Sequence, residues 1–503
     1  MFNNALSFVD RSPARTPWTR RPSARAVYRS LMRERDGAPG SIDEMARHSS
    51  CIFLSDRLAQ AARLPSDLPD DPSGLAVWIN ENHRAVALEY EQYLGARKAG
   101  APRRYFADRS HALYFLRAVA PTKKVDGAWL YGLLPHWRDA RFAGLIRIYL
   151  EELGNGVAAQ NHMSLYGRLL REHDCDDWQG LDDAFFNQGA IQLSLAHNAA
   201  QFLPEIIGFN LGYEQLPLHL LVTAYELTEL GIDPYYFTLH VTVDNASTGH
   251  ARRAIEAVAD LAPRIGGRDD FHRRVALGYR LNQLPLGTIE AIAGFDLERE
   301  LLRMLEAKAM VGARMHSDYC RINGRTVNEW LSSAESVKGF LDALVARGWI
   351  RRGHPVQESR FWQLLQGEAA PMSGVFSAYE QQLLQDWISH DQGVGAGGEG
   401  IIPAAVHRFR AARDGASRSP AAPTVAVAGT TLDELIRACL PSSQHASLPL
   451  DPDLQMLKDR VRRADSRAEA IDMLIPLMSP AHHATPAGLA ATRLFTGLLA
   501  APA

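Results

Sequence analysis

Apolar residues recur every three or four positions along most of the chain from about residue 44 onward. The segments AVWINENHRAVALEYEQYLGARK and FAGLIRIYLEEL show this spacing, which is typical of helices with one buried face. The pattern continues between residues 290 and 390, in segments such as LERELLRMLEAKAMVGARMHSDYC and YEQQLLQDWISH. Runs of strictly alternating apolar and polar residues are scarce. The sequence therefore predicts an all-α protein.

One short segment, YYFTLHVTV at residues 235–243, alternates for a few positions in the manner of a strand. β-Branched and aromatic residues are sparse in most of the chain, so a sheet for it to join is not evident. We interpret it as the start of a buried helix.

Composition divides the chain into parts. The first 40 or so residues are rich in Arg, Pro, Ser and Gly and poor in periodic apolar positions, which is typical of a segment that cannot bury enough surface to fold. Between about 391 and 430 the chain shifts to Gly, Ala and Pro, as linkers do. The predicted parts are a flexible basic N-terminal arm at 1–43, a main helical domain at 44–290, a helical extension at 291–390, a Gly/Ala/Pro-rich linker at 391–440 and a small helical tail at 441–503.

Charge and cysteine usage narrow the class of protein. The 54 basic and 57 acidic side chains give a formal charge of -3, which provides no global field to attract nucleic acid or an anionic membrane. No apolar stretch approaches the roughly 20 residues of a membrane span. The four cysteines lie far apart, without the paired spacing of a zinc clip or a disulfide framework. We therefore expect a cytoplasmic protein that binds neither nucleic acid nor membrane.

The first candidate site lies in YLEELGNGVAAQNHMSLYGRLL. Glu152 and His162 are ten positions apart, which on an unbroken helix means about 15 Å of rise and different faces. Gly154 and Gly156 lie between them and permit a kink that brings the two side chains together. The alternative is an exposed acidic pair, Glu151 and Glu152, beside a glycine that ends the helix.

The second candidate site lies in FLPEIIGFNLGYEQLPLHLLVTAYEL, where Glu205 and Glu214 occur among residues of a buried helix. A carboxylate on an apolar face is costly unless it is paired or bound to a cation. The run from Gly208 to Gly212 contains small residues that let two helices approach closely. The alternative is that both glutamates face water where the helix emerges.

The third candidate site lies in GIDPYYFTLHVTVDNASTGHARRAI. His240 and Asp244 are at positions i and i+4, one turn apart on a helix face, and can offer an imidazole and a carboxylate to one ion. His250 follows six positions after Asp244 and on a regular helix points away, so a local bulge is required. The alternative is a polar helix end with a capping aspartate.

Taken together, the three segments supply carboxylates and imidazoles in the order Glu and His, then Glu, then His, Asp and His. Mixed oxygen and imidazole donors suit iron or manganese better than structural zinc or calcium. Two ions about 3.5 to 4 Å apart, bridged by a carboxylate, would neutralise such buried acids. The conjunction of the three segments therefore predicts a two-metal centre.

These motifs resemble a known family. The patterns E-x-G-x-G-x5-H, G-x5-E and H-x3-D with a downstream His are similar to those of the iron-containing redox enzyme family, the haem-oxygenase-like diiron oxidases and oxygenases. The likeness covers roughly residues 100 to 260. It implies a haem-oxygenase-like helical bundle at 44–290 that binds two non-haem Fe(II) ions, with manganese as the alternative metal. The ligands that the resemblance implies are Glu152, His162, Glu214, His240, Asp244 and His250.

The chain departs from the family pattern at one point. The usual form ends H-x3-D-x2-H, whereas DNASTGH inserts three residues before His250. His250 is therefore the least secure of the implied ligands, and Glu205 is the reserve candidate should Glu214 point elsewhere.

The resemblance also implies a function. We expect an oxygenase or oxidase that uses O2 as co-substrate and acts on a small amino-acid-like or fatty-acid-like substrate, with N-oxygenation of an amine as the preferred reaction. The alternative is a non-catalytic binding or scaffold protein that retains the fold. In that case the aromatic residues of SRFWQLLQ and VFSAYEQQLLQDWI would form a partner surface or a homodimer face, although such a stripe is more often ordinary core.

Two further segments carry no assigned role. His482 and His483 in SPAHHATPAG fit a solvated loop, since no carboxylate accompanies them. PTKKVDGAWLYG, which contains Lys123, Lys124 and Asp126, fits either a substrate entrance or a turn that joins two helices.

Overall fold

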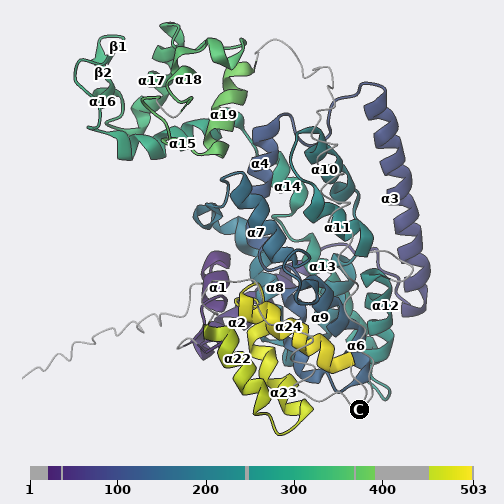
Figure 1. The fold of residues 1–503 in the computed structure, drawn as a ribbon. Helices are drawn as coiled ribbons and strands as arrows, with labels where there is room; N and C mark the ends of the chain where they lie inside the picture. The colour runs from purple at the N-terminus through teal and green to yellow at the C-terminus, as the bar shows by residue number, and fades with distance from the viewer. Residues whose placement is uncertain (1–20, 36–37, 244–248, 368–369, 391–451, 501–503) are drawn as a thin grey trace, which may run out of the picture.

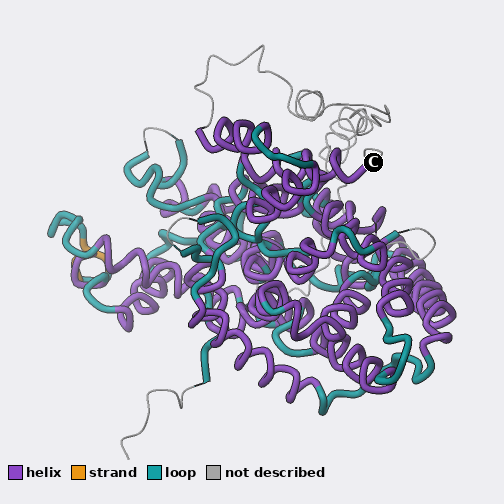
Figure 2. Tube along the Cα trace, turned by 90° about the horizontal axis from the view of Figure 1, so that it is seen from below, coloured by secondary structure: helices purple, strands orange, loops and turns teal. Residues whose placement is uncertain are grey.

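The computed structural model describes residues 21–35, 38–243, 249–367, 370–390 and 452–500. Across these ranges the chain is helical apart from its loops and one pair of very short strands (Figure 2), so the predicted all-α fold is confirmed. The segment 235–243 is a helix, as predicted. Asp244 and the predicted linker at 391–440 lie outside the described residues. Among the helices that are described, none has both the length and the apolar character needed to cross a membrane.

The centre of the molecule is a bundle of helices (Figure 1). Its α-helices are α4 (Arg109–Ala118), α5 (Ala120–Lys123), α6 (Ala143–Glu152), α7 (His162–Glu172), α8 (Asn187–His197), α9 (Ala199–Tyr213), α10 (Leu218–Glu229), α11 (Tyr235–Val243), α12 (His250–Leu261) and α13 (Arg268–Arg280). Short 3-10 helices connect them, among them η3 (Ala128–His136), η5 (Gly154–Gly156), η6 (Trp178–Gly180) and η7 (Asp183–Phe186).

Helices α9 and α13 pack with their backbones in close contact. A Cβ placed on Gly208 would lie 1.8 Å from the carbonyl oxygen of Val275, and one on Gly278 would lie 2.0 Å from the carbonyl oxygen of Glu205. No side chain fits at either position, so only glycine permits this approach. The close packing predicted from the small residues of α9 is confirmed, and it fixes the end of α9 where Glu214 lies.

The N-terminal part differs from the predicted loose arm. Residues 24–31 form α1 (Ala24–Leu31), which packs against α2 (Glu44–Ala61) and α8. Val27, Tyr28 and Leu31 are buried at the spacing of one helix face, a pattern too short to stand out among the surrounding arginines. The prediction of a flexible arm through residue 43 is therefore wrong for this segment. Helix α3 (Leu75–Lys98) follows and runs along one side of the bundle (Figure 1).

Residues 288–390 form a second helical group, most of which projects from one side of the bundle (Figure 1). Its elements are α14 (Thr288–Ala293), α15 (Leu297–Gly312), β1 (Arg321–Ile322), β2 (Arg325–Thr326), α16 (Val327–Trp330), α17 (Ala334–Ala346), α18 (Arg360–Gln363) and α19 (Ala378–Ser389). Strands β1 and β2 are antiparallel. Phe361, Trp362, Tyr379 and Trp387 are buried in its core, so these aromatic side chains are packing residues and not an exposed partner face.

The C-terminal helices return to the bundle. They are α22 (Pro452–Arg462), α23 (Arg467–Leu474) and α24 (Pro486–Ala500), with η10 (Ile475–Met478) between the last two. Arg493 donates a hydrogen bond to the carbonyl oxygen of Gly156, and Tyr149 donates one to the carbonyl oxygen of Met478. His483 is buried beside Asn161, which corrects the prediction of a solvated histidine. This tail therefore covers the turn that precedes α7.

Candidate metal centre

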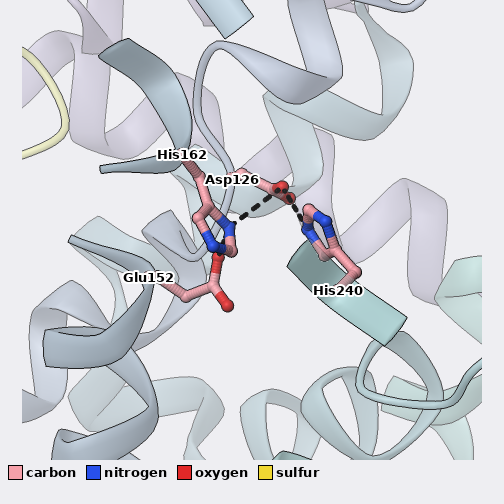
Figure 3. A group of neighbouring side chains, drawn as sticks. All are labelled: Asp126, Glu152, His162 and His240. Carbon is pink, nitrogen blue, oxygen red and sulfur yellow. Dashed lines mark ion pairs between the residues drawn. The ribbon is translucent and has the colours of Figure 1, made fainter. Parts of the chain in front are cut away.

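Four buried side chains meet inside the bundle and form what we call the first donor group, Asp126, Glu152, His162 and His240 (Figure 3). One donor atom from each lies within 4.8 Å of the others. Nδ1 of His162 lies 2.5 Å from Oε2 of Glu152, and Nε2 of His240 lies 3.4 Å from Oδ2 of Asp126. In Figure 3 the carboxylate of Asp126 lies between the two imidazole rings. The group contains the donors that a divalent cation needs.

A second donor group adjoins the first and consists of Glu152, Glu214 and His250, all buried. Nδ1 of His250 lies 2.9 Å from Oε2 of Glu214 and 3.5 Å from Oε1 of Glu152. The structure therefore brings Glu214 and His250 to the same place as Glu152. His250 reaches it as the first residue of α12, a helix separate from α11, and not through a bulge in one continuous helix as the sequence suggested.

Glu152 belongs to both donor groups. Its Oε2 atom faces His162 of the first group, and its Oε1 atom faces His250 of the second. A carboxylate whose two oxygens face two separate sets of ligands has the arrangement of a bridging ligand in a two-metal site.

Local backbone geometry brings Glu152 and His162 together. Helix α6 ends at Glu152, and the turn that follows contains Gly154, Asn155 and Gly156, all with positive φ. Asn161 then caps α7, because its side chain accepts a hydrogen bond from the backbone of Ser164. His162 is therefore the first residue of a new helix. The glycine break predicted from the sequence is the feature that achieves this reversal.

Asp126 was not predicted as a site residue. It lies in the turn between α5 and η3, and the next residue, Gly127, has φ 74°. A Cβ on Gly127 would lie 2.9 Å from both Cβ and Cγ of Glu152. The absence of a side chain at position 127 thus allows the turn to pass directly against Glu152. An Asp-Gly pair marks a tight turn in the sequence, but nothing in the sequence indicates what the turn packs against.

Hydrogen bonds to Asp126 orient its carboxylate. Tyr213 donates to Oδ1 at 2.7 Å and Tyr236 donates to Oδ2 at 2.5 Å, while Nζ of Lys123 lies 3.7 Å from Oδ2. Burial raises the pKa of Asp126, but the charge of Lys123 and the interaction with His240 outweigh it and lower that pKa. Burial and the charge of Asp126 raise the pKa of both tyrosines well above the ordinary value. Both phenols therefore stay protonated and act as donors.

The orientation of His240 fixes which nitrogen faces the site. Its Nδ1 atom lies 2.8 Å from the carbonyl oxygen of Tyr236, and a carbonyl can only accept a hydrogen bond, so Nδ1 carries the proton. Nε2, which faces Asp126, then carries the lone pair that a metal requires.

His250 is held in the same way from its other side. Its Nε2 atom lies 2.9 Å from Oε2 of Glu151, and Arg253 donates to the same carboxylate at 2.6 Å. Burial raises the pKa of Glu151, but the hydrogen bonds from His250 and Arg253 outweigh it and lower that pKa to about 2. An ionised Glu151 accepts a hydrogen bond from the Nε2–H group, which leaves Nδ1 to face the second donor group.

The contact between His162 and Glu152 and the burial of the carboxylates both fit a bound metal ion. Nδ1 of His162 and Oε2 of Glu152 lie only 2.5 Å apart, yet Nδ1 has no hydrogen-bond partner among the described residues. The two donor atoms therefore lie close enough together, within the same buried group, to bind one ion. Carboxylates buried beside imidazoles also need a cation to offset their desolvation.

Glu205, the reserve candidate, lies outside both donor groups. Arg274 of α13 forms a bidentate ion pair with Glu205, in which Nε donates to Oε1 and Nη2 donates to Oε2, each at 2.6 Å. The guanidinium of Arg274 thus offsets the free-energy cost of burying the Glu205 carboxylate.

A small cavity of about 240 Å³ borders the first donor group. Lys123, Tyr213 and His240 lie on its wall beside the site, and Nζ of Lys123 lies 3.1 Å from the Tyr213 hydroxyl. Apolar side chains, among them Val119 and Leu220, line another part. Its volume suits a small molecule.

Comparison with known proteins bears on this geometry. A family model described as an iron-containing redox enzyme matches residues 113–283. The matched segment includes every residue of both donor groups, Asp126 among them, and the resemblance noted in the sequence is thereby confirmed. No curated protein and no solved structure matches the chain.

Proposed function

We propose that this protein holds two ferrous ions in the two donor groups and uses dioxygen to oxidise a small substrate in the cytoplasm. The observation that carries the proposal is the position of Glu152, whose two carboxylate oxygens face different donor groups. The match of residues 113–283 to a family of iron-containing redox enzymes supports the choice of iron, with manganese as the alternative.

Each donor residue has a role in this proposal. Asp126, His162 and His240 would hold one ion, Glu214 and His250 would hold the other, and Glu152 would contribute to both. Asp244, predicted one helical turn after His240, is an additional ligand in the proposal. When bound, the iron pair supplies the electrons that reduce dioxygen. Tyr213 and Tyr236 keep Asp126 oriented, and Glu151 does the same for His250.

The cavity beside the first donor group supports an amino-acid-like substrate. Lys123 offers a cation for a carboxylate, and its position next to Tyr213 and Asp126 sets the distance from that carboxylate to the metal centre. His219, which also lines the cavity, has a pKa lowered to about 4 by burial and by the charge of Lys123. It is therefore neutral near pH 7 and can accept a hydrogen bond from an amine. This arrangement favours oxygenation of the substrate nitrogen.

Oxygen uptake tests the proposal. The full chain, loaded anaerobically with Fe(II), should consume O2 and should do so faster with an amino acid than with the corresponding decarboxylated amine. Lys123→Met should remove that preference and keep bound iron, while the exposed Lys98→Met serves as control. A chain that binds no iron and consumes no O2 would instead favour the binding or scaffold alternative.

A further inference from the structure

We call the 240 Å³ cavity beside the first donor group the substrate cavity. A second cavity, of about 250 Å³, lies on the other side of its wall. Two pairs of consecutive residues form part of this wall. Lys123 and Phe185 line the substrate cavity, whereas Lys124 and Phe186 line the second one. The turn after α5 and the end of η7 therefore separate two compartments, and no residue is shared between their linings.

Cationic side chains gather at the second cavity. Lys124, Arg29 and Arg33 line it, and the amine of Lys124 lies over Gly167 of α7. A Cβ on Gly167 would lie 3.0 Å from Nζ of Lys124 and 3.3 Å from Nη1 of Arg171. The two cationic groups thus lie over the same point of the helix, and any residue larger than glycine at position 167 would displace them.

These charges lack anionic partners in the part of the chain that the structure describes. Neither Lys124, Arg33 nor Arg171 forms a side-chain hydrogen bond or an ion pair there, and Arg29 donates only to the carbonyl oxygen of Gln179. Like charges held this close repel one another, and partial burial of Lys124 increases the cost. Arg171 does not line the cavity, but an anion bound in the cavity beside Lys124 would offset this repulsion.

The remaining wall of the cavity is aromatic. The rings of Tyr28, Trp178 and Phe186 contact one another, with centroids 5.4 to 6.2 Å apart. All three line the cavity. Such a cluster offers a flat ligand both stacking and edge-on contacts. The basic chain before α1, which includes RSPARTPWTRR, has the wrong charge to fill a cationic pocket.

We propose that this cavity is a second small-molecule site, distinct from the substrate cavity, for a planar aromatic acid. The ring lies against Tyr28, Trp178 and Phe186, and the carboxylate or phosphate lies between Lys124 and the arginines. The volume accommodates a molecule of one or two rings.

Calorimetric titration of the iron-loaded full chain under anaerobic conditions tests this proposal. The probes are indole-3-acetate, its neutral amide, phenyl phosphate and inorganic phosphate. We expect both aromatic anions to bind saturably. The neutral amide, which lacks the negative charge, and inorganic phosphate, which lacks the aromatic ring, should each bind at least about tenfold more weakly.

Adjacent lysines give matched variants. Lys124→Met should weaken binding of indole-3-acetate by about tenfold, whereas Lys98→Met and Lys123→Met should leave it unchanged. Arg33→Gln, a change at an exposed residue, should weaken it about two- to fivefold and covers the case in which Lys124→Met fails to fold.

Three results would overturn the proposal. The first is equal affinity for the acid and the amide. The second is loss of binding in Lys123→Met but not in Lys124→Met, which would place the acid in the substrate cavity. The third is no saturable binding of either aromatic anion.

Discussion

The Nε2 atom of His250 lies 2.9 Å from Oε2 of Glu151, the residue directly before Glu152 in α6. Two consecutive glutamates thus have different positions in the same site. Glu152 faces both donor groups, while Glu151 holds the outer nitrogen of His250 and is itself held by Arg253. The acidic pair that the sequence left open as an exposed helix end is therefore part of the site.

Glu151→Gln should weaken metal binding without abolishing it. The amide oxygen still accepts a hydrogen bond from the Nε2–H group, but the loss of charge makes His250 a poorer metal ligand, and we expect metal affinity to fall about tenfold. Competition with a chelator measures this change. Glu256→Gln, at an exposed ion pair on α12, is the control, and equal affinities of the two variants would show that Glu151 does not support His250.

Asp126→Asn tests the residue that sequence patterns did not indicate. Because Asp126 belongs only to the first donor group, we expect bound iron to fall from about two ions per chain to about one. Elemental analysis after anaerobic loading and desalting gives the count. The control is Asp342→Asn, an exposed position outside both donor groups. A full complement of iron in Asp126→Asn would mean that Asp126 is not a ligand.

Gly127→Ala should damage both stability and the site. Its positive φ alone costs about 1 kcal/mol with any side chain, and the added Cβ would collide with Glu152. Gly266→Ala is a matched control, since Gly266 has φ 62° and open space around its Cβ position. Denaturant unfolding should show a larger loss for Gly127→Ala, and only this variant should lose iron. Similar behaviour of both variants would leave backbone strain as the sole effect.

Asp386 in α19 should make stability depend on pH. Burial, with a contribution from the charge of Asp108, raises its pKa from 3.8 to about 6. The folded state therefore binds a proton that the unfolded chain has already lost, so the free energy of unfolding falls as pH rises from about 4 to about 6 and then levels off.

Asp386→Asn mimics the protonated form. We expect it to be more stable than the parent at pH 7.5 by on the order of 2 kcal/mol, and to lose this advantage by about pH 4.5. Thermal melts of both proteins at the two pH values test this, with the exposed Asp342→Asn as control. An advantage that is absent at pH 7.5, or grows as pH falls, would contradict the assignment.

The sequence predicted the helices because three- and four-residue spacing of apolar positions depends only on local geometry. It also predicted the meeting of Glu152 and His162, since the glycines that reverse the chain lie between them. Asp126 was missed because its turn reaches the site through packing against Glu152, a contact distant in sequence. For the same reason the sequence did not predict the burial of His483 or of the helix at residues 24–31. Segments distant in the sequence pack against both of them.

In the proposed function, Glu152 bridges two metal ions. Mössbauer spectroscopy of the ⁵⁷Fe-loaded full chain after exposure to O2 tests it most directly. We expect about two irons per chain in a magnetically coupled diferric state, and isolated or lost iron in Glu152→Gln but not in Glu256→Gln. A single iron per chain, or two that show no coupling, would contradict it.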